Sequence, residues 1–130
     1  MNQHHKLLKW ILPLTLLALA ANAANIAGKW SGVIAIDDSG GKIETPVELY
    51  LEQKAGALSG KIGKRNDPDS VAIRNAKIEG DRVSFESSPT EASGPMAFSL
   101  TVHGEEMRGE MRGVAQGNEI VAKVIFSRAK

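Results

Sequence analysis

Few residues of this chain have the type and spacing that metal binding or catalysis requires. His103 is the only histidine after the first 23 residues, and a lone imidazole cannot hold a metal without carboxylate or thiolate partners. Asp67 and Asp69 offer oxygen atoms to calcium, but the twelve-residue ligand spacing with a distal glutamate is absent, and Pro68 indicates a turn. We therefore predict no metal site and no cofactor.

Acid–base and nucleophilic groups are also poorly placed for catalysis. Asp37-Asp38 and Glu105-Glu106 are adjacent carboxylates in expected turns, where neighbouring side chains point apart into water. No nucleophile-elbow motif accompanies any serine. Serines expected on the outward-facing positions of strands are Ser59, Ser84, Ser99 and Ser127. The chain is therefore predicted not to be an enzyme.

Any functional side chain here must be positioned by strands, because period-two alternation runs through the chain from Trp30 onward. Apolar residues and one threonine occupy the odd positions from 43 to 51, and glutamate occupies three of the even positions nearby. This pattern is typical of a strand that is buried on one face. The same alternation predicts eight strands: Trp30–Ile36, Ile43–Gln53, Leu58–Gly63, Val71–Ile78, Arg82–Ser87, Met96–Val102, Met107–Gly113 and Ile120–Arg128.

The links between these strands are mostly short and rich in turn residues, as at Ala55-Gly56 and Gly104-Glu105. Only Arg65–Ser70 and Ser88–Pro95 are longer. Short turns force antiparallel neighbours, and closing such a meander removes its two unpaired edges. The pattern predicts an all-β fold, an eight-stranded antiparallel up-and-down barrel, with a two-sheet β-sandwich as the alternative.

Two of the expected hairpins resemble each other in sequence. Pro46–Ile62 matches Pro95–Met111 at an offset of 49 residues. Gly60 and Gly109 fall at equivalent places between apolar residues, where a sheet bends or another backbone approaches closely. Common turn chemistry is the alternative explanation of the match.

The first 23 residues have the layout of a secretory signal peptide. Lys6 and Lys9 precede an apolar run from Ile11 to Ala20, and small residues end the segment at Ala23. The run is too short to span about 30 Å of hydrocarbon as a stable helix, and no cysteine is present for lipid attachment. We predict a signal peptide over residues 1–23, one β-barrel domain over residues 24–130, no integral membrane segment after cleavage, and a periplasmic or secreted location.

Charge and cysteine content limit the partners of this domain. Removing the leader changes the balance of basic and acidic residues from 16 minus 15 to 14 minus 15. Because the remaining basic residues are interleaved with acidic ones, we expect no nucleic-acid partner. The chain has no cysteine, so its stability must come from packing and sheet pairing rather than disulfides.

The inward-facing positions of the expected strands are almost entirely apolar. Such a lining forms either a filled core or a pocket for an apolar molecule, and its glycines and methionines permit partial filling. The residues that we expect to line a ligand are Leu49, Leu51, Ile62, Phe85, Phe98, Leu100, Met107 and Met111.

The first and last strands carry two short motifs. Gly28, Lys29 and Trp30 open the first strand, and the last ends at Ser127 and Arg128. The pair resembles the lipocalin and avidin-like calycin barrels, which begin with a Gly-x-Trp motif and end with a basic residue. The resemblance implies that Gly28, Trp30 and Arg128 are structural anchors, with Arg128 stacked on Trp30 at the closed end of the barrel.

Outside these motifs the chain departs from those families. Avidin-like proteins hold biotin with several tryptophans and a set of polar groups, whereas residues 24–130 contain one tryptophan and one tyrosine, so biotin binding is not implied. Kernel lipocalins are longer, with a C-terminal helix and usually a disulfide. The size is closer to that of avidin and of the small bacterial barrel inhibitors of secreted metalloproteases, which also begin with a Gly-x-Trp strand.

Two binding functions are compatible with these features. The apolar inward-facing positions favour a small hydrophobic ligand in the barrel. The alternative is a protein-interaction module with a protein partner, such as an inhibitor of a secreted or envelope hydrolase, that uses its loops or a flexible start at Ala24–Ala27. The identity of the ligand or partner stays open.

Overall fold

The computed structural model describes residues 24–130, except for 39, 67–69, 89–94, 116 and 130. The predicted signal peptide and the candidate calcium ligands Asp67 and Asp69 lie outside the described residues. The elements of the described part are all strands: β1 (Gly28–Asp38), β2 (Gly41–Lys54), β3 (Ala57–Lys64), β4 (Val71–Ala72), β5 (Arg74–Glu79), β6 (Arg82–Ser87), β7 (Met96–His103), β8 (Glu106–Ala115) and β9 (Asn118–Arg128).

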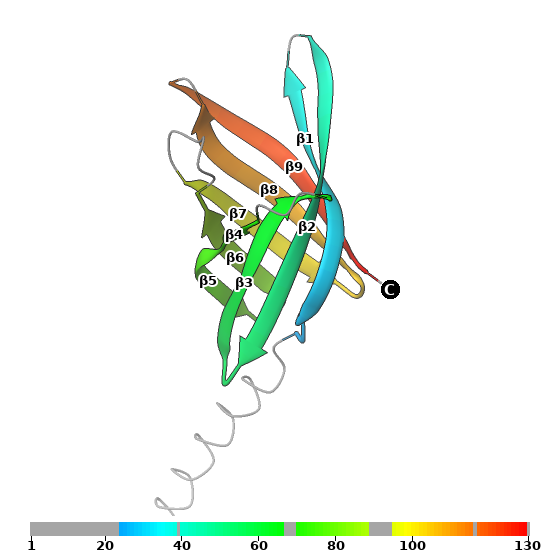
Figure 1. The fold of residues 1–130 in the computed structure, drawn as a ribbon, viewed down its shortest axis with the longest axis vertical. Helices are drawn as coiled ribbons and strands as arrows, with labels where there is room; N and C mark the ends of the chain where they lie inside the picture. The colour runs from blue at the N-terminus through cyan, green and yellow to red at the C-terminus, as the bar shows by residue number, and fades with distance from the viewer. Residues whose placement is uncertain (1–23, 39, 67–69, 89–94, 116, 130) are drawn as a thin grey trace, which may run out of the picture.

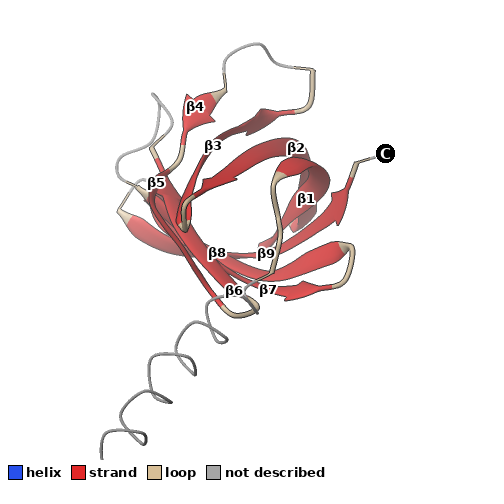
Figure 2. Cartoon of the chain, turned by 90° about the horizontal axis from the view of Figure 1, so that it is seen from below, coloured by secondary structure: helices blue, strands red, loops and turns tan. Residues whose placement is uncertain are grey.

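These strands form one antiparallel sheet in the order β4-β3-β2-β1-β9-β8-β7-β6-β5. The sheet curls into a nearly closed barrel, with strand β1 joined to the last strand, β9, and the two ends of the sheet brought together (Figures 1 and 2). A single curled sheet agrees with the predicted barrel rather than with the two separate sheets of a sandwich.

The predicted number of eight strands is wrong, because the segment from Val71 to Ile78 is two strands. Strand β4 pairs with β3, whereas β5 pairs with β6, so this one segment serves both ends of the sheet. Between them the backbone N–H of Ile73 donates a hydrogen bond to the carbonyl oxygen of Gly60, at 3.0 Å. The register then shifts between Arg74 and Lys77, and Asn75 has a φ of 52°. This irregularity turns the chain from strand β4, at one end of the sheet, to strand β5, at the other.

The two ends of the barrel differ in their connections. We call the end that carries the turns β2–β3, β5–β6 and β7–β8 the floor, and the end that carries the links β1–β2, β3–β4, β6–β7 and β8–β9 the loop end (Figure 1). The described residues that flank both of the longer predicted loops lie at the loop end, and residues 67–69 and 89–94 of these loops lie outside the described residues. Ala24–Ala27 enters at the floor.

The predicted sequence repeat corresponds to a repeat in the sheet. In the hairpin β2–β3, Leu51 is paired with Gly60, and in the hairpin β7–β8, Leu100 is paired with Gly109, at the same offset of 49 residues. A Cβ atom on either glycine would collide with the partner strand's backbone, at the carbonyl oxygen of Tyr50 or Ser99. Glycine is therefore required by close approach of two strands at equivalent places.

The interior of the barrel is a single apolar cluster. Within it the rings of Phe85 and Phe98 stack with their centroids 4.7 Å apart, on the neighbouring strands β6 and β7. The buried apolar residues of the described chain are Ile26, Trp30, Val47, Leu49, Leu51, Ile62, Ile73, Val83, Phe85, Phe98, Leu100, Met107, Met111, Ala122, Val124 and Phe126.

Candidate functional site

Trp30 and Arg128 lie together at the floor of the barrel. Strands β1 and β9 pair these two residues directly, which places their side chains on the same face of the sheet. The guanidinium carbon of Arg128 lies 4.4 Å from the centroid of the Trp30 ring, and Trp30 is fully buried. A cation over an indole face stabilises a protein by about 0.5–2 kcal/mol, and here it also covers the end of the core.

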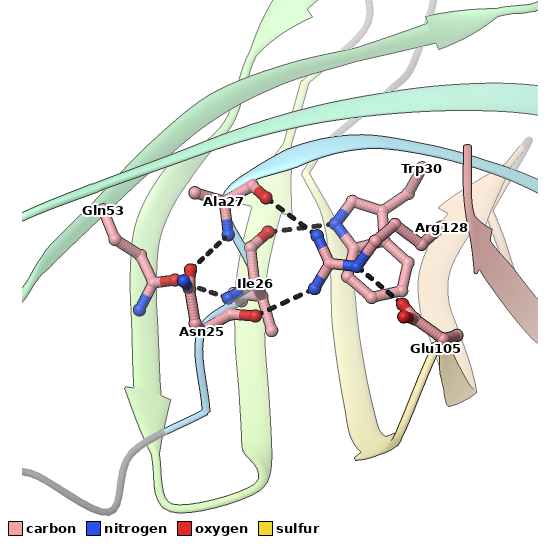
Figure 3. A network of polar contacts seen from close by, with 7 residues as sticks. All are labelled: Asn25, Ile26, Ala27, Trp30, Gln53, Glu105 and Arg128. Carbon is pink, nitrogen blue, oxygen red and sulfur yellow. Dashed lines mark hydrogen bonds and ion pairs between the residues drawn. The ribbon is translucent and has the colours of Figure 1, made fainter. Parts of the chain in front are cut away.

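Arg128, at the end of β9, also binds two other parts of the chain, the segment Ala24–Ala27 and the β7–β8 turn (Figure 3). Its Nη1 donates to the carbonyl oxygen of Ala27 and its Nη2 to that of Asn25, both at 2.8 Å. Its Nε lies 2.8 Å from the carboxylate of Glu105, in the β7–β8 turn. The planar guanidinium can serve these acceptors at once, whereas a lysine ammonium on one flexible stem could not.

Gly28, the third predicted anchor, lies beside this guanidinium. Its φ is 126°, a conformation that residues with a side chain rarely adopt, and a Cβ atom there would be 3.4 Å from Nη1 of Arg128. The glycine lets the chain turn from Ala27 into strand β1 while its backbone faces the arginine.

The segment Ala24–Ala27 crosses the floor and is held in place, so the expectation of a flexible start is wrong. Ile26 is fully buried, and its carbonyl oxygen accepts a 3.0 Å hydrogen bond from the indole nitrogen of Trp30. The side chain of Gln53 accepts from the backbone N–H of Ile26 and donates to the carbonyl oxygen of Ala24 (Figure 3). The N–H of Ala24 donates to Gly80 in the β5–β6 turn. Together these bonds close the floor with the first residues of the described chain.

The structure places the eight predicted ligand-lining residues along the inner face of the barrel wall, from Leu51 and Met107 near the floor to Phe85 and Phe98 nearer the loop end. They belong to the buried apolar cluster, and the most exposed of them, Ile62, retains 6% of its surface. These residues are Leu49, Leu51, Ile62, Phe85, Phe98, Leu100, Met107 and Met111. They form the packed interior, so a ligand entering the barrel would first contact residues nearer its ends.

The loop end presents apolar side chains that are only partly buried. Ile34 and Ile36 on β1, Val71 on β4 and Met96 on β7 pack against the core while retaining part of their exposed surface. Ser87 joins them: it is paired with Met96 and faces inward in the same alternation as Val83 and Phe85. At the loop end, apolar side chains of the inward face are therefore partly exposed to solvent, and the Ser87 hydroxyl lies beside them.

The other candidate groups of the sequence do not come together. His103 is exposed at the end of β7, and Glu105 and Glu106 take separate partners, Arg128 and Arg108. Within the described part of the chain no group of three or more His, Cys, Asp or Glu residues is arranged to hold a metal ion.

Two lysines flank the ring of Tyr50 on the outer face of the sheet. Tyr50 lies between its cross-strand neighbours Lys29 and Lys61, whose Nζ atoms are 5.7 and 5.3 Å from the centre of its ring. A hydrogen bond from Lys29 to Glu48, across 3.2 Å, raises the pKa of Lys29 above its usual range. Contacts of this kind between exposed groups contribute little to stability, and we assign no site to them.

Because comparison with known proteins finds no relative, inferences about function depend on the fold and on these contacts. No protein-family model, no curated protein and no solved structure matches this chain. Among the described residues, no helix is long and apolar enough to cross a membrane. The class of protein that the structure defines is a nearly closed antiparallel β-barrel in which Ile26, Trp30 and Arg128 cover the floor.

Proposed function

We propose that this protein is an exported, non-catalytic β-barrel of the calycin type that binds a small apolar molecule at the loop end. The observation that carries the proposal is the difference between the two ends. Ile26, Trp30 and Arg128 cover the floor, where Leu58, Ile78 and Val102 also keep part of their surface exposed. Among the described residues, no ring-and-guanidinium cover of this kind lies over Ile34, Val71 and Met96, the partly exposed inward residues of the loop end. Apolar groups that converge beside a few polar ones are typical of small-molecule sites.

Titration of the purified domain with a fluorescent fatty acid and with a general apolar dye tests this proposal. We expect saturable binding of at least one probe, weakened about tenfold or more by Met96→Asp, because a carboxylate at the rim opposes burial of an apolar molecule. Ile125→Asp is the matched control: Ile125 is 46% exposed on the outward-facing positions of β9 and should leave binding unchanged. Absence of saturable binding, or equal losses in both variants, would overturn the proposal.

A second function, protein recognition, is favoured by the shape of the β1–β2 hairpin. Strand β1 pairs with β9 only as far as Ala35, and β2 pairs with β3 only from Val47, so beyond these residues the two strands form a two-stranded projection (Figure 1). Ile43, in this projection, is 52% exposed. A projecting ribbon of this kind can add a strand from another protein, such as a hydrolase that it inhibits.

Replacing Ile43 with aspartate separates the two functions. If the hairpin binds a protein, Ile43→Asp should reduce co-purification of a hydrolase from envelope or culture-medium extracts by about tenfold while leaving dye binding intact. Unchanged recovery of the hydrolase would remove the hairpin from consideration, and failure to recover any specific partner would count against a protein-binding role.

A further inference from the structure

Ser87 is the one buried polar side chain among the residues that the structure describes. It retains 1% of its surface, and its Oγ atom has no hydrogen-bond partner. Buried hydroxyl groups in proteins are nearly always paired, because losing water without gaining a partner is costly. A lone unpaired hydroxyl among apolar side chains therefore calls for a reason.

The position of Ser87 connects it to the loop end. It is the last residue of β6 and is paired with Met96, the first residue of β7. Two residues earlier on β6, Phe85 is buried and stacks on Phe98. The hydroxyl thus lies between the packed interior and the rim. Met96, which is partly buried, is unbranched and flexible enough to move aside for a ligand.

We propose that Ser87 recognises the single uncharged oxygen of an otherwise apolar ligand, such as a long-chain alcohol. This inference rests on the proposed binding function and names the chemistry of the ligand. A hydroxyl can donate to or accept from such an oxygen, which would satisfy both groups away from water. A carboxylate is disfavoured, because none of the buried side chains of the described chain carries a positive charge to compensate it.

Competition between an apolar dye and three small molecules tests the inference: 1-octanol, octanoate at pH 8, and nonane, which matches the alcohol in size. We expect 1-octanol to displace the dye at a concentration about tenfold lower than octanoate requires. Ser87→Ala should weaken 1-octanol about tenfold and leave nonane unchanged, because it removes one hydrogen bond and little volume. Ser84→Ala, on the outward-facing positions of the same strand, is the matched control.

Thermal unfolding of the same variants separates recognition from a structural role. Ser87→Ala should melt at the same temperature as the parent protein or higher, because it removes an unpaired buried hydroxyl. A lower melting temperature would assign Ser87 to the fold and overturn the inference. Equal displacement of the dye by octanoate and 1-octanol would also overturn the inference. An unchanged ratio of 1-octanol to nonane affinity in Ser87→Ala would do the same, even with dye binding intact. Absence of dye binding in the parent protein would overturn the proposed function as well.

Discussion

Replacing Trp30 with alanine is expected to lower the free energy of unfolding by about 3–5 kcal/mol, the range found for large aromatic residues removed from cores. Trp30 has no exposed surface, it carries the Arg128 guanidinium 4.4 Å from its ring centre, and its indole nitrogen donates to Ile26. The substitution would leave a cavity under the floor and would remove that hydrogen bond. It would also leave Arg128 without the ring on which it stacks.

Urea denaturation followed by circular dichroism measures this loss. Ile125→Ala is the control: it lies on strand β9 as Arg128 does, it is 46% exposed, and its cost should stay within about 1 kcal/mol. Hydrogen exchange adds a second readout, because the amides of Ile26 and Ala27 should lose protection before those of the core strands. A loss below about 1.5 kcal/mol, or unchanged protection of these amides, would show that Trp30 does not hold the floor together.

The arrangement of strands could be read from the sequence because burial on one face imposes a period of two. The error at Val71–Ile78 arose where that period breaks. Val71 and Ile73 occupy odd positions, whereas Ala76 and Ile78 occupy even ones, and the register of β5 shifts between Arg74 and Lys77. The change of phase was present in the sequence, and an extra residue in a strand is its physical cause.

The floor was only partly predictable. The resemblance to calycins pointed to Gly28, Trp30 and Arg128, but it did not indicate that Ile26 and Gln53 complete the closure. Gln53 bonds to residues 27 and 29 positions away, a separation that local patterns do not encode. The sequence feature that could have indicated this role is the polar side chain of Gln53 at the inward-facing position after Leu51 on β2.

Ser87 was missed for a different reason. The alternation of strand residues predicts which serines face outward, and the same alternation places Ser87 inward with Val83 and Phe85. What the sequence could not indicate is that its hydroxyl would lack a partner, because this depends on the strands and loops packed around it.

The second large effect concerns the repeated hairpins. Gly109→Ala is expected to lower the free energy of unfolding by about 3 kcal/mol, at the upper end of the cost of overpacking. The new Cβ atom would collide with the carbonyl oxygen of Ser99 and lie 2.9 Å from the Cα of Leu100. Because both contacts are with backbone atoms, strands β7 and β8 must separate, which weakens the hydrogen bonds between them.

Gly113→Ala, on the same strand, is the matched control for this prediction. Its Cβ would meet the side chain of Met96, 3.1 Å from Cγ, and a methionine side chain can move away. We therefore expect a cost below about 1 kcal/mol in the same urea titration. Gly60→Ala should resemble Gly109→Ala, since its Cβ would collide with the Tyr50 backbone in the equivalent hairpin. Similar costs at Gly109 and Gly113 would contradict the argument, because they would show that contact with the neighbouring backbone is not what demands glycine.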